Sequence, residues 1–147
     1  MSHDDPFDLE RFVNAQRDVY SRALSEIKSG QKKSHWMWFV FPQIIGLGNS
    51  PTSILYSIKS IAEAKAYLSH SILAPRLVEC SSAVLKSTAT SAKQIFSSID
   101  AVKLCSSLTL FDYLSPGTVF SEVIGKYFDN RRDDKTLTIL AGMSQVI

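Results

Sequence analysis

Residues 8–30 read DLERFVNAQRDVYSRALSEIKSG, and this stretch decides the fold class. Its apolar residues recur at spacings of three and four, as one face of an α-helix requires: Leu9, Phe12, Val13, Tyr20, Ala23, Leu24 and Ile27. The Asp8 carboxylate can cap the first turn, and Gly30 can end the helix in a left-handed conformation. We therefore predict one amphipathic helix over residues 8–28.

Helical patterns continue along the rest of the chain. Ser60 and Glu63 have the spacing of a capping box, and Asp134 can cap a terminal helix. Helices are predicted at residues 60–68, 73–85, 91–97, 100–114 and 118–128, and after Asp134. Strand-like patterns are confined to residues 36–41 and 54–58, too few for a sheet with its own hydrophobic face. The sequence therefore predicts an all-α fold, a helical array with little or no sheet.

The size and composition of the chain are those of one globular domain. Its 147 residues are 45% hydrophobic and 20% charged, which is enough to bury one core without disulfides or metals. We expect a single domain over residues 1–147, with a helical core at residues 6–140. Residues 1–5 are polar and acidic, and we expect them to form a flexible tail.

Charge and cysteine content exclude several classes of protein. Lys and Arg number 16 against 14 Asp and Glu, a formal net charge of +2, whereas a nucleic-acid binder usually has a strongly basic stripe. The longest wholly apolar run, residues 36–41, is far shorter than the roughly 20 residues that cross a membrane. Cys80 and Cys105 suit buried free thiols. We expect no nucleic-acid or membrane partner, and a cytoplasmic location.

Residues 31–51 are predicted to form mainly an ordered loop, which holds the least ordinary sequence of the chain. We call residues 35–43, HWMWFVFPQ, the aromatic segment. Its Trp36 and Trp38 suit stacking on a flat ring, with His35 and Gln43 as polar contacts. Alternatively, the segment is a hydrophobic plug that makes the loop part of the core. Both interpretations are open at this point.

Polar residues elsewhere add candidates for binding and catalysis. The candidate ligand-binding residues are Lys33, His35, Trp36, Trp38, Gln43, Arg76 and Lys103. The three cations among them can meet a phosphate. Glu79 and Asp112 are the candidate carboxylates for glycoside cleavage, and His35 can act as acid or base near neutral pH.

Other features of these residues have simpler structural interpretations. Arg76 and Glu79 have the spacing of a surface ion pair on one helix. Gln16 lies within an apolar stripe, where a buried amide needs hydrogen-bond partners. The predicted helix 100–114 is rich in hydroxyl residues, which lowers helix propensity and marks either a site or close helix packing. Three scattered histidines, and no phosphate-binding or dinucleotide motif, lead us to expect no metal and no cofactor.

The run SHWMWFVFPQ at residues 34–43, followed by GLGNS at residues 46–50, resembles the hallmark of an uncharacterised family. This is the domain-of-unknown-function family eighteen-ten, whose members often carry the name calpastatin. Further blocks fit it: YLSH at residues 67–70, SSLTLF at residues 106–111 and DKTL at residues 134–137. The resemblance spans residues 7 to about 140. It implies a mainly helical fold and no established activity.

A looser likeness connects the chain with the NADAR superfamily, helical N-glycosidases that act on ribosylated nitrogen compounds. Residues 62–76, followed by a lysine-bearing helix, are similar to theirs. The chain lacks their Cys-Ala-Glu-Gln helix, so their catalytic glutamate has no counterpart here.

Two hypotheses about function follow from these observations. In the first, the domain binds a nucleotide-derived or phosphoribosyl-type small molecule, with N-glycosidase-like chemistry as one form. In the second, it is a noncatalytic interaction domain whose aromatic residues 36–41 dock a partner protein. The directions of the aromatic and polar candidates discriminate between them. Convergence on a concave cavity favours the first hypothesis, and a convex apolar patch favours the second.

Overall fold

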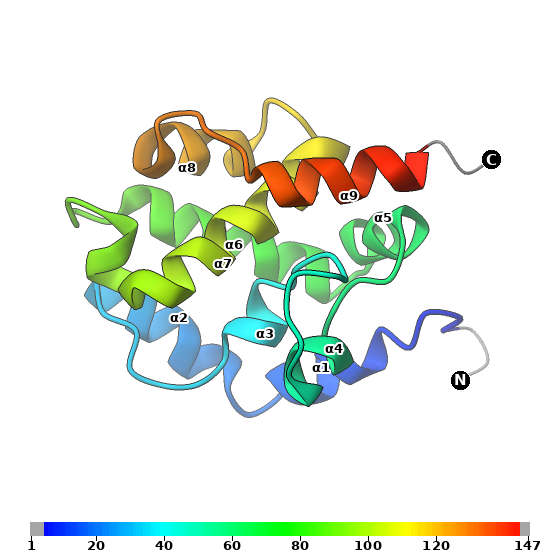
Figure 1. Ribbon diagram of the computed structural model, residues 1–147. Helices are drawn as coiled ribbons and strands as arrows, with labels where there is room; N and C mark the ends of the chain where they lie inside the picture. The colour runs from blue at the N-terminus through cyan, green and yellow to red at the C-terminus, as the bar shows by residue number, and fades with distance from the viewer. Residues whose placement is uncertain (1–4, 145–147) are drawn as a thin grey trace.

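The computed structural model describes residues 5–144, which form an all-α fold (Figure 1). The helices are α1 (Glu10–Gln16), α2 (Tyr20–Ser29), α3 (Met37–Val40), α4 (Pro51–Leu55), α5 (Ile61–Ser69), α6 (Leu73–Lys86), α7 (Ala92–Leu114), α8 (Val119–Phe128) and α9 (Asp134–Ser144). Within the described part of the chain, β-type pairing is limited to an isolated parallel bridge between Ile44 and Ile58. The predicted all-α fold is confirmed. Of the predicted tail at residues 1–5, all but Asp5 lies outside the described residues.

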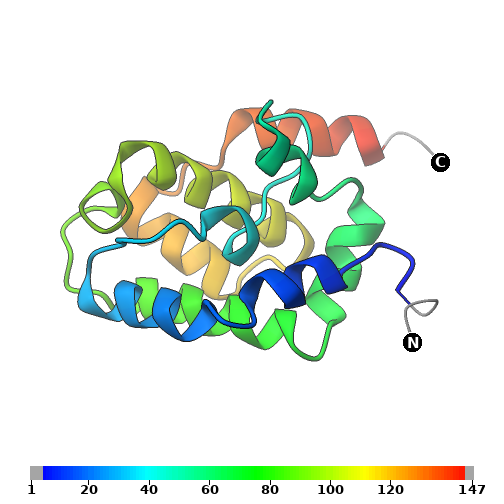
Figure 2. The ribbon, with the colours of Figure 1, turned by 90° about the horizontal axis from the view of Figure 1, so that it is seen from below.

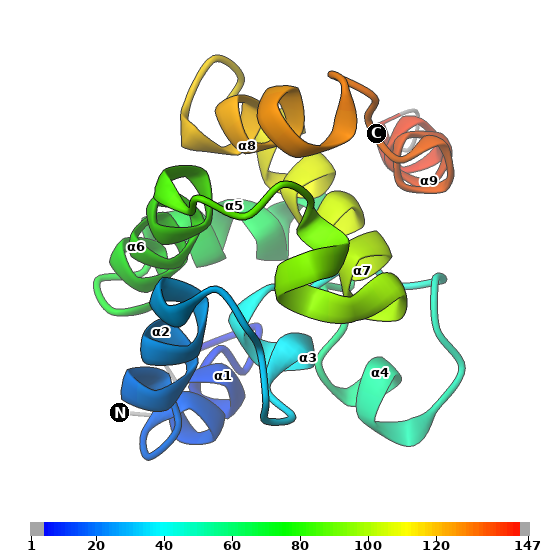
Figure 3. The same cartoon turned by 90° about the vertical axis from the view of Figure 1, so that its left-hand side faces the viewer.

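Helix α7 is the centre of the arrangement and packs against α3, α5, α8 and α9 (Figure 3). The short α3 lies between α1 and α7, in the middle of the view in Figure 2. A row of aromatic rings crosses the core from α1 through α5 and α7 to α8. Its members are Phe12, Tyr67, Phe111 and Phe120, with successive ring centroids 5.2, 5.4 and 5.9 Å apart. These contacts tie four helices to one hydrophobic core.

The prediction of one helix over residues 8–28 is wrong, because the chain turns at residues 17–19 between α1 and α2. The N–H of Val19 bonds to the carbonyl of Gln16, a tighter turn than an α-helix makes. The turn lets α1 pack against α3 while α2 packs against α6. A straight helix could not face both partners, so tertiary packing overrides a continuous helical pattern. Both halves still bury their predicted apolar faces.

Of the two residues predicted to end this helical region, Gly30 is confirmed and Asp8 is not. Gly30 ends α2 at φ 84°, as predicted, and its N–H bonds to the Ile27 carbonyl. Asp8 does not cap α1, since it lies outside the helix at φ 53°. Asp5 takes that role instead, because its carboxylate accepts from the backbone N–H groups of Leu9 and Glu10 at 2.8 and 2.9 Å. A carboxylate one turn earlier thus satisfies the free donors.

The predicted pair of helices at 91–97 and 100–114 corresponds to the two parts of α7. Ser91 caps the first part by accepting from the N–H of Gln94 at 3.1 Å. Ser97 then interrupts the helix at φ 73° and ψ 170°, a region populated almost only by glycine. The predicted boundary between the two helices is therefore confirmed.

The remaining predicted caps are confirmed at one position and displaced by one residue at another. The Ser60 hydroxyl accepts from the N–H of Glu63 at 3.1 Å, which is one half of the predicted capping box. The Glu63 carboxylate accepts from the N–H of Lys59 at 2.9 Å instead of that of Ser60. At α9, however, the cap is Asp133 rather than Asp134. Its carboxylate accepts from the backbone N–H of Thr136 at 3.0 Å and from the Thr136 hydroxyl at 2.6 Å.

The long connection at residues 31–51 is ordered, as predicted, and contains the single turn of α3. The strand-like pattern of residues 36–41 is therefore helical in the structure. After α4 the chain is held by Arg11 of α1, whose guanidinium donates to the carbonyls of Leu55 and Ser57 at 2.8 and 2.9 Å. The same guanidinium pairs with Glu63 at 2.7 Å. It thereby clamps the segment between α4 and α5 to α1 and α5.

The two cysteines are free thiols in different environments. Cys80 is fully buried, as predicted, and burial raises the pKa of its thiol to about 12. Cys105 is only half-buried, and its pKa is raised by partial burial as well. Neither thiol is activated as a nucleophile, because activation requires a lowered pKa.

Candidate functional site

Most of the aromatic segment belongs to the core, since the buried residues are Trp36, Met37, Val40, Phe41 and Pro42. Trp36 is fully buried, and its indole N–H donates to Glu26 at 2.9 Å. The Glu26 carboxylate also accepts from the Lys33 and Ser34 N–H groups and from the Ser34 hydroxyl. Burial by itself would raise the pKa of Glu26, but these hydrogen bonds outweigh it and lower the pKa to about 2. The interpretation of the aromatic segment as a hydrophobic plug is therefore correct for Trp36.

The middle of the segment, Trp38 and Phe39, reaches the surface. Trp38 is only half-buried, and its ring centroid lies 4.9 Å from the ammonium of Lys103. Trp38 lines a narrow hollow of about 20 Å³, whose wall includes Gln43 and Ile44. That hollow shares Gln43 and residues 47 and 48 with a larger cavity. Trp38 therefore lies next to a pocket, whereas Trp36 does not.

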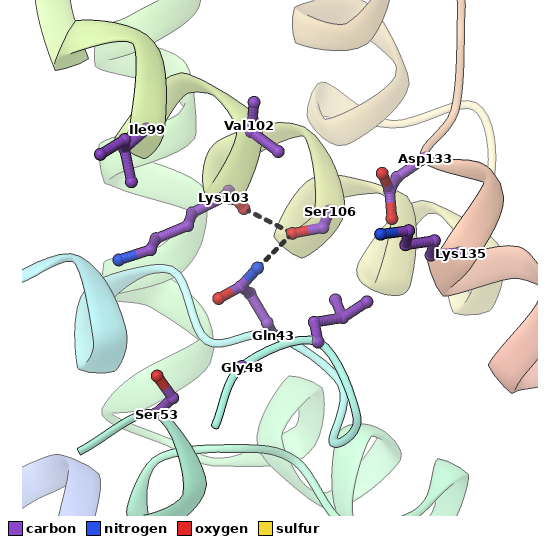
Figure 4. A pocket seen from close by; sticks show the side chains of 10 residues that line it. Gln43, Gly48, Ser53, Ile99, Val102, Lys103, Ser106, Asp133 and Lys135 are labelled. Atoms are coloured by element: carbon purple, nitrogen blue, oxygen red, sulfur yellow. Dashed lines mark hydrogen bonds between the residues drawn. The ribbon is translucent and has the colours of Figure 1, made fainter. Parts of the chain in front are cut away.

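The larger cavity has a volume of about 350 Å³ and is the candidate site (Figure 4). It lies between residues 43–53, the middle of α7 and the start of α9, and we call it the pocket. Its lining residues are Gln43, Leu47, Gly48, Ser53, Ile99, Val102, Lys103, Ser106, Asp133 and Lys135. Cavities of roughly 300 to 1,000 Å³ are typical of small-molecule sites. The pocket has room for a ligand at the lower end of that range.

Gln43 is held in the pocket by a hydrogen bond to Ser106. The Ser106 hydroxyl donates to the Lys103 carbonyl at 3.0 Å, so it accepts from the Gln43 amide N–H at 2.6 Å (Figure 4). The amide oxygen of Gln43 then points away from Ser106. An amide oxygen accepts hydrogen bonds. The pocket therefore offers an acceptor to a ligand N–H or O–H group.

Two lysines flank Gln43 on opposite sides (Figure 4). Lys103 extends from α7 on one side, and Lys135 from the first turn of α9 on the other. Asp133 is the one carboxylate in the lining, and it is occupied in capping α9 through Thr136. One oxygen of that carboxylate is used in the cap, and the two cations of the lining are Lys103 and Lys135. An anionic group such as a phosphate is their natural partner.

The apolar walls and the glycine turn complete the pocket. Leu47, Ile99 and Val102 line it, and the last two are 71% and 62% exposed. At Gly48 a Cβ atom would lie 2.8 Å from the Ser53 side chain. Glycine is therefore needed for residues 46–50 to approach α4 so closely. The result is a pocket with apolar walls and a polar floor.

Three of the predicted residues meet around the pocket: Gln43 and Lys103 in its wall and Trp38 beside it. The other predicted residues lie elsewhere. Lys33 and His35 are exposed and do not line the pocket. Trp36 lies in the core.

The remaining predicted residues belong to two polar clusters away from the pocket. Arg76 donates to Gln16 at 3.3 Å, and Tyr20 donates to Glu79, so the predicted Arg76–Glu79 pair does not form. Gln16 also donates to the Phe39 carbonyl at 2.7 Å, the structural role predicted for it. Asp112 is buried and pairs with Arg132 at 3.1 Å.

Eight lining residues were not among the predicted site residues: Leu47, Gly48, Ser53, Ile99, Val102, Ser106, Asp133 and Lys135. For Ile99 and Val102 a signal existed, because both stand on the polar side of the helix that carries Lys103. An exposed apolar pair beside a candidate lysine is typical of a binding site. For Lys135 the sequence signal was weak, since charged residues at a helix start are common.

Two general features complete the description of residues 5–144. None of their helices combines the length and the apolar composition that crossing a bilayer requires. Within the same residues, no group of three or more His, Cys, Asp or Glu side chains is placed to hold a metal ion.

Comparisons with known proteins give relatives whose descriptions name no activity. The family described as a protein of unknown function (DUF1810) matches residues 6–140. The crystal structure of the conserved hypothetical protein Rv1873 from Mycobacterium tuberculosis is similar, with 46% sequence identity and a TM-score of 0.91. That match covers 93% of this chain and 99% of the other. No curated protein matches the chain.

Proposed function

The chain belongs to the DUF1810 family, whose description names no activity, and we propose from its pocket that it binds a small phosphorylated molecule of the nucleotide or sugar phosphate type. The observation that carries the proposal is the arrangement of Lys103, Gln43 and Lys135 around one cavity of about 350 Å³. The lysines meet a phosphate, and the Gln43 oxygen meets an N–H or O–H group of the ring or sugar. The apolar walls cover the ring.

The proposal is for binding rather than for cleavage of a glycosidic bond. Such cleavage normally uses a carboxylate that stabilises positive charge on the sugar or activates water. Glu79 and Asp112, the candidates from the sequence, do not line the pocket, and Asp133 is engaged at the start of α9. N-glycosidase-like turnover is therefore included as a measurement and is not the proposed function.

Docking of a partner protein through residues 36–41 receives less support. Trp36, Val40 and Phe41 are buried, which leaves Trp38 and Phe39 half-buried as the contribution of this run to the surface. A protein interface of ordinary size needs roughly 800 Å² on each side.

The test is a binding panel with matched charged and uncharged compounds. AMP, ribose 5-phosphate, ADP-ribose and inorganic pyrophosphate are compared with adenosine and ribose by thermal shift and isothermal titration calorimetry. Phosphorylated compounds are expected to bind, and their uncharged partners to bind at least about tenfold more weakly, since charge-assisted bonds are the strongest the pocket offers. Release of free base or ribose is followed by chromatography in the same samples.

Two lysine variants link binding to the pocket. Lys103→Met is expected to weaken binding of the phosphorylated compounds about tenfold. Lys33→Met removes the same charge from an exposed position outside the pocket and is expected to leave binding unchanged. Absence of binding across the panel, or equal effects of the two variants, would contradict the proposal.

A further inference from the structure

Asp100 connects the two lysines that lie against the two tryptophans. Its carboxylate lies 2.9 Å from the ammonium of Lys32 and 3.6 Å from that of Lys103. The Lys32 ammonium is 5.0 Å from the ring centroid of Trp36, and the Lys103 ammonium is 4.9 Å from that of Trp38. One carboxylate therefore holds two ammonium groups, each beside an indole ring.

The two ammonium groups are held to different degrees. The Lys32 side chain is 8% exposed, makes the shorter contact with Asp100 and also donates to the Ser34 carbonyl. The Lys103 side chain is 24% exposed, makes the longer contact and lines the pocket. Lys32 is thus a permanent partner of the carboxylate, because a buried charge is costly to leave unpaired. Lys103 can exchange partners.

The charges of this cluster do not cancel. Two cations share one anion, and the ion pairs found within residues 5–144 join Lys32 and Lys103 to Asp100 alone. The excess positive charge is on the side of Lys103, where the pocket lies. An anion that enters the pocket would neutralise this excess positive charge.

We infer that Asp100 sets the affinity of the pocket for its anionic ligand, by holding Lys103 in a pair that the ligand must open. When a phosphate enters, Lys103 becomes its counter-ion, and Asp100 keeps Lys32. Asp100 is a positioning residue in this scheme, since it acts on the ligand through Lys103. The inference rests on the proposed function, because it presumes an anion in the pocket.

The scheme has an uncommon consequence for mutagenesis. Asp100 competes with the ligand for Lys103 and also repels it, as like charges do. Removal of its charge should therefore tighten binding, whereas damage to a merely structural residue would weaken it. Asp100→Asn keeps an oxygen that can accept from Lys32 while it removes the charge.

The experiment uses the full chain and inorganic pyrophosphate as the probe, with calorimetry at low salt. Asp100→Asn is expected to lower the Kd by about three- to tenfold, and the gain is expected to shrink near 0.5 M salt, where charges are screened. In a Lys103→Met background the gain should be smaller, because only the direct repulsion by Asp100 is then relieved. Asp18→Asn removes an equal charge from an exposed position outside the pocket and serves as the matched control.

A second measurement needs no change at Asp100. Of the two tryptophans in the chain, Trp38 is the one beside the pocket, so withdrawal of the Lys103 ammonium from its ring should change the indole emission. Saturating pyrophosphate is expected to shift the emission of the wild-type protein and to leave that of Lys103→Met unchanged. This readout remains available if Asp100→Asn fails to fold.

The outcomes separate the two proposals. If pyrophosphate binds the wild-type protein but Asp100→Asn binds it equally or more weakly with an unchanged melting temperature, the inference is overturned and the proposed function stands. The same holds if binding occurs without a change in Trp38 emission. If no probe of the panel binds either protein, the proposed function and the inference both fail.

Discussion

Trp36 and Trp38 stand two residues apart, and their surroundings are opposite. Trp36 is fully buried, with its ring against Phe41 and Phe96 at centroid distances of 6.4 and 6.2 Å. Trp38 is half-buried beside the pocket, under the ammonium of Lys103. Trp36 is the residue before α3 and has a non-helical backbone, whereas Trp38 belongs to the single turn of α3, so the start of this turn separates the two side chains. Whether a side chain belongs to the core or to the pocket is thus decided for each residue separately, and not for the aromatic segment as a whole.

The largest expected effect that tests this comparison is on stability. Trp36→Ala should lower the free energy of unfolding by about 3 to 5 kcal/mol, because it opens a large cavity in the core. It also deprives Glu26 of a hydrogen-bond donor. Trp38→Ala should cost about 1 kcal/mol. Urea denaturation of both variants measures the difference, and equal losses would remove the distinction between the two residues.

A second prediction concerns the acid sensitivity of the Trp36 side. Because the pKa of Glu26 is lowered from 4.5 to about 2 on folding, its stabilising effect is complete above pH 4.5 and is lost as the pH falls toward 2. This amounts to about 3 kcal/mol. The loss of stability in Glu26→Gln should therefore be large at pH 7 and smaller by about that amount near pH 2.

The control for this measurement is Glu10→Gln. Glu10 is an exposed carboxylate whose side chain is 56% exposed and makes only a loose contact with Arg17. Its substitution should change the free energy of unfolding by no more than about 0.5 kcal/mol at either pH. If the cost of Glu26→Gln were independent of pH, the hydrogen bonds to Glu26 would not favour its charged form.

The smallest expected effect is on the Trp38 side. Trp38→Leu keeps an apolar side chain but removes the ring beneath the Lys103 ammonium, which is worth about 0.5 to 1 kcal/mol at a partly exposed position. Because binding withdraws Lys103 from this ring, the affinity for pyrophosphate should rise about two- to fivefold. The melting temperature should change little. Titration of wild-type and variant protein at equal salt gives the comparison, and an unchanged Kd would argue against a role for the ring.

The helical faces could be predicted from the sequence because their cause is local. Phe12, Ala23 and Ile27 are buried as the three- and four-residue spacing indicated. The turn at residues 17–19 could not be predicted, since neither glycine nor proline marks it and the apolar spacing resumes beyond it. Its cause is the separate packing of α1 on α3 and of α2 on α6. Such contacts join residues far apart in the chain.

The pocket was accessible to sequence analysis only in part, for a similar reason. Gln43 and Lys103 were selected as polar residues near unusual patterns, and the structure brings both to one cavity. Arg76 and Glu79 were selected on similar grounds, but they lie on α6 and meet Gln16 and Tyr20. Lys135 was missed because its place in the wall depends on how α9 packs on α7. Side-chain chemistry suggested candidates, and tertiary packing chose among them.

The clamp formed by Arg11 bears on where the chain can be cut, extended or circularly permuted. Its guanidinium makes five hydrogen bonds, to the carbonyls of residues 7, 8, 55 and 57 and to Glu63. A long connection is ordinarily the first place to insert a tag, cut a chain or create new termini. Here a cut between α4 and α5 would separate residues 55 and 57 from the first helix. New termini are better placed at the exposed turn of Pro116 and Gly117, far along the chain from the clamp.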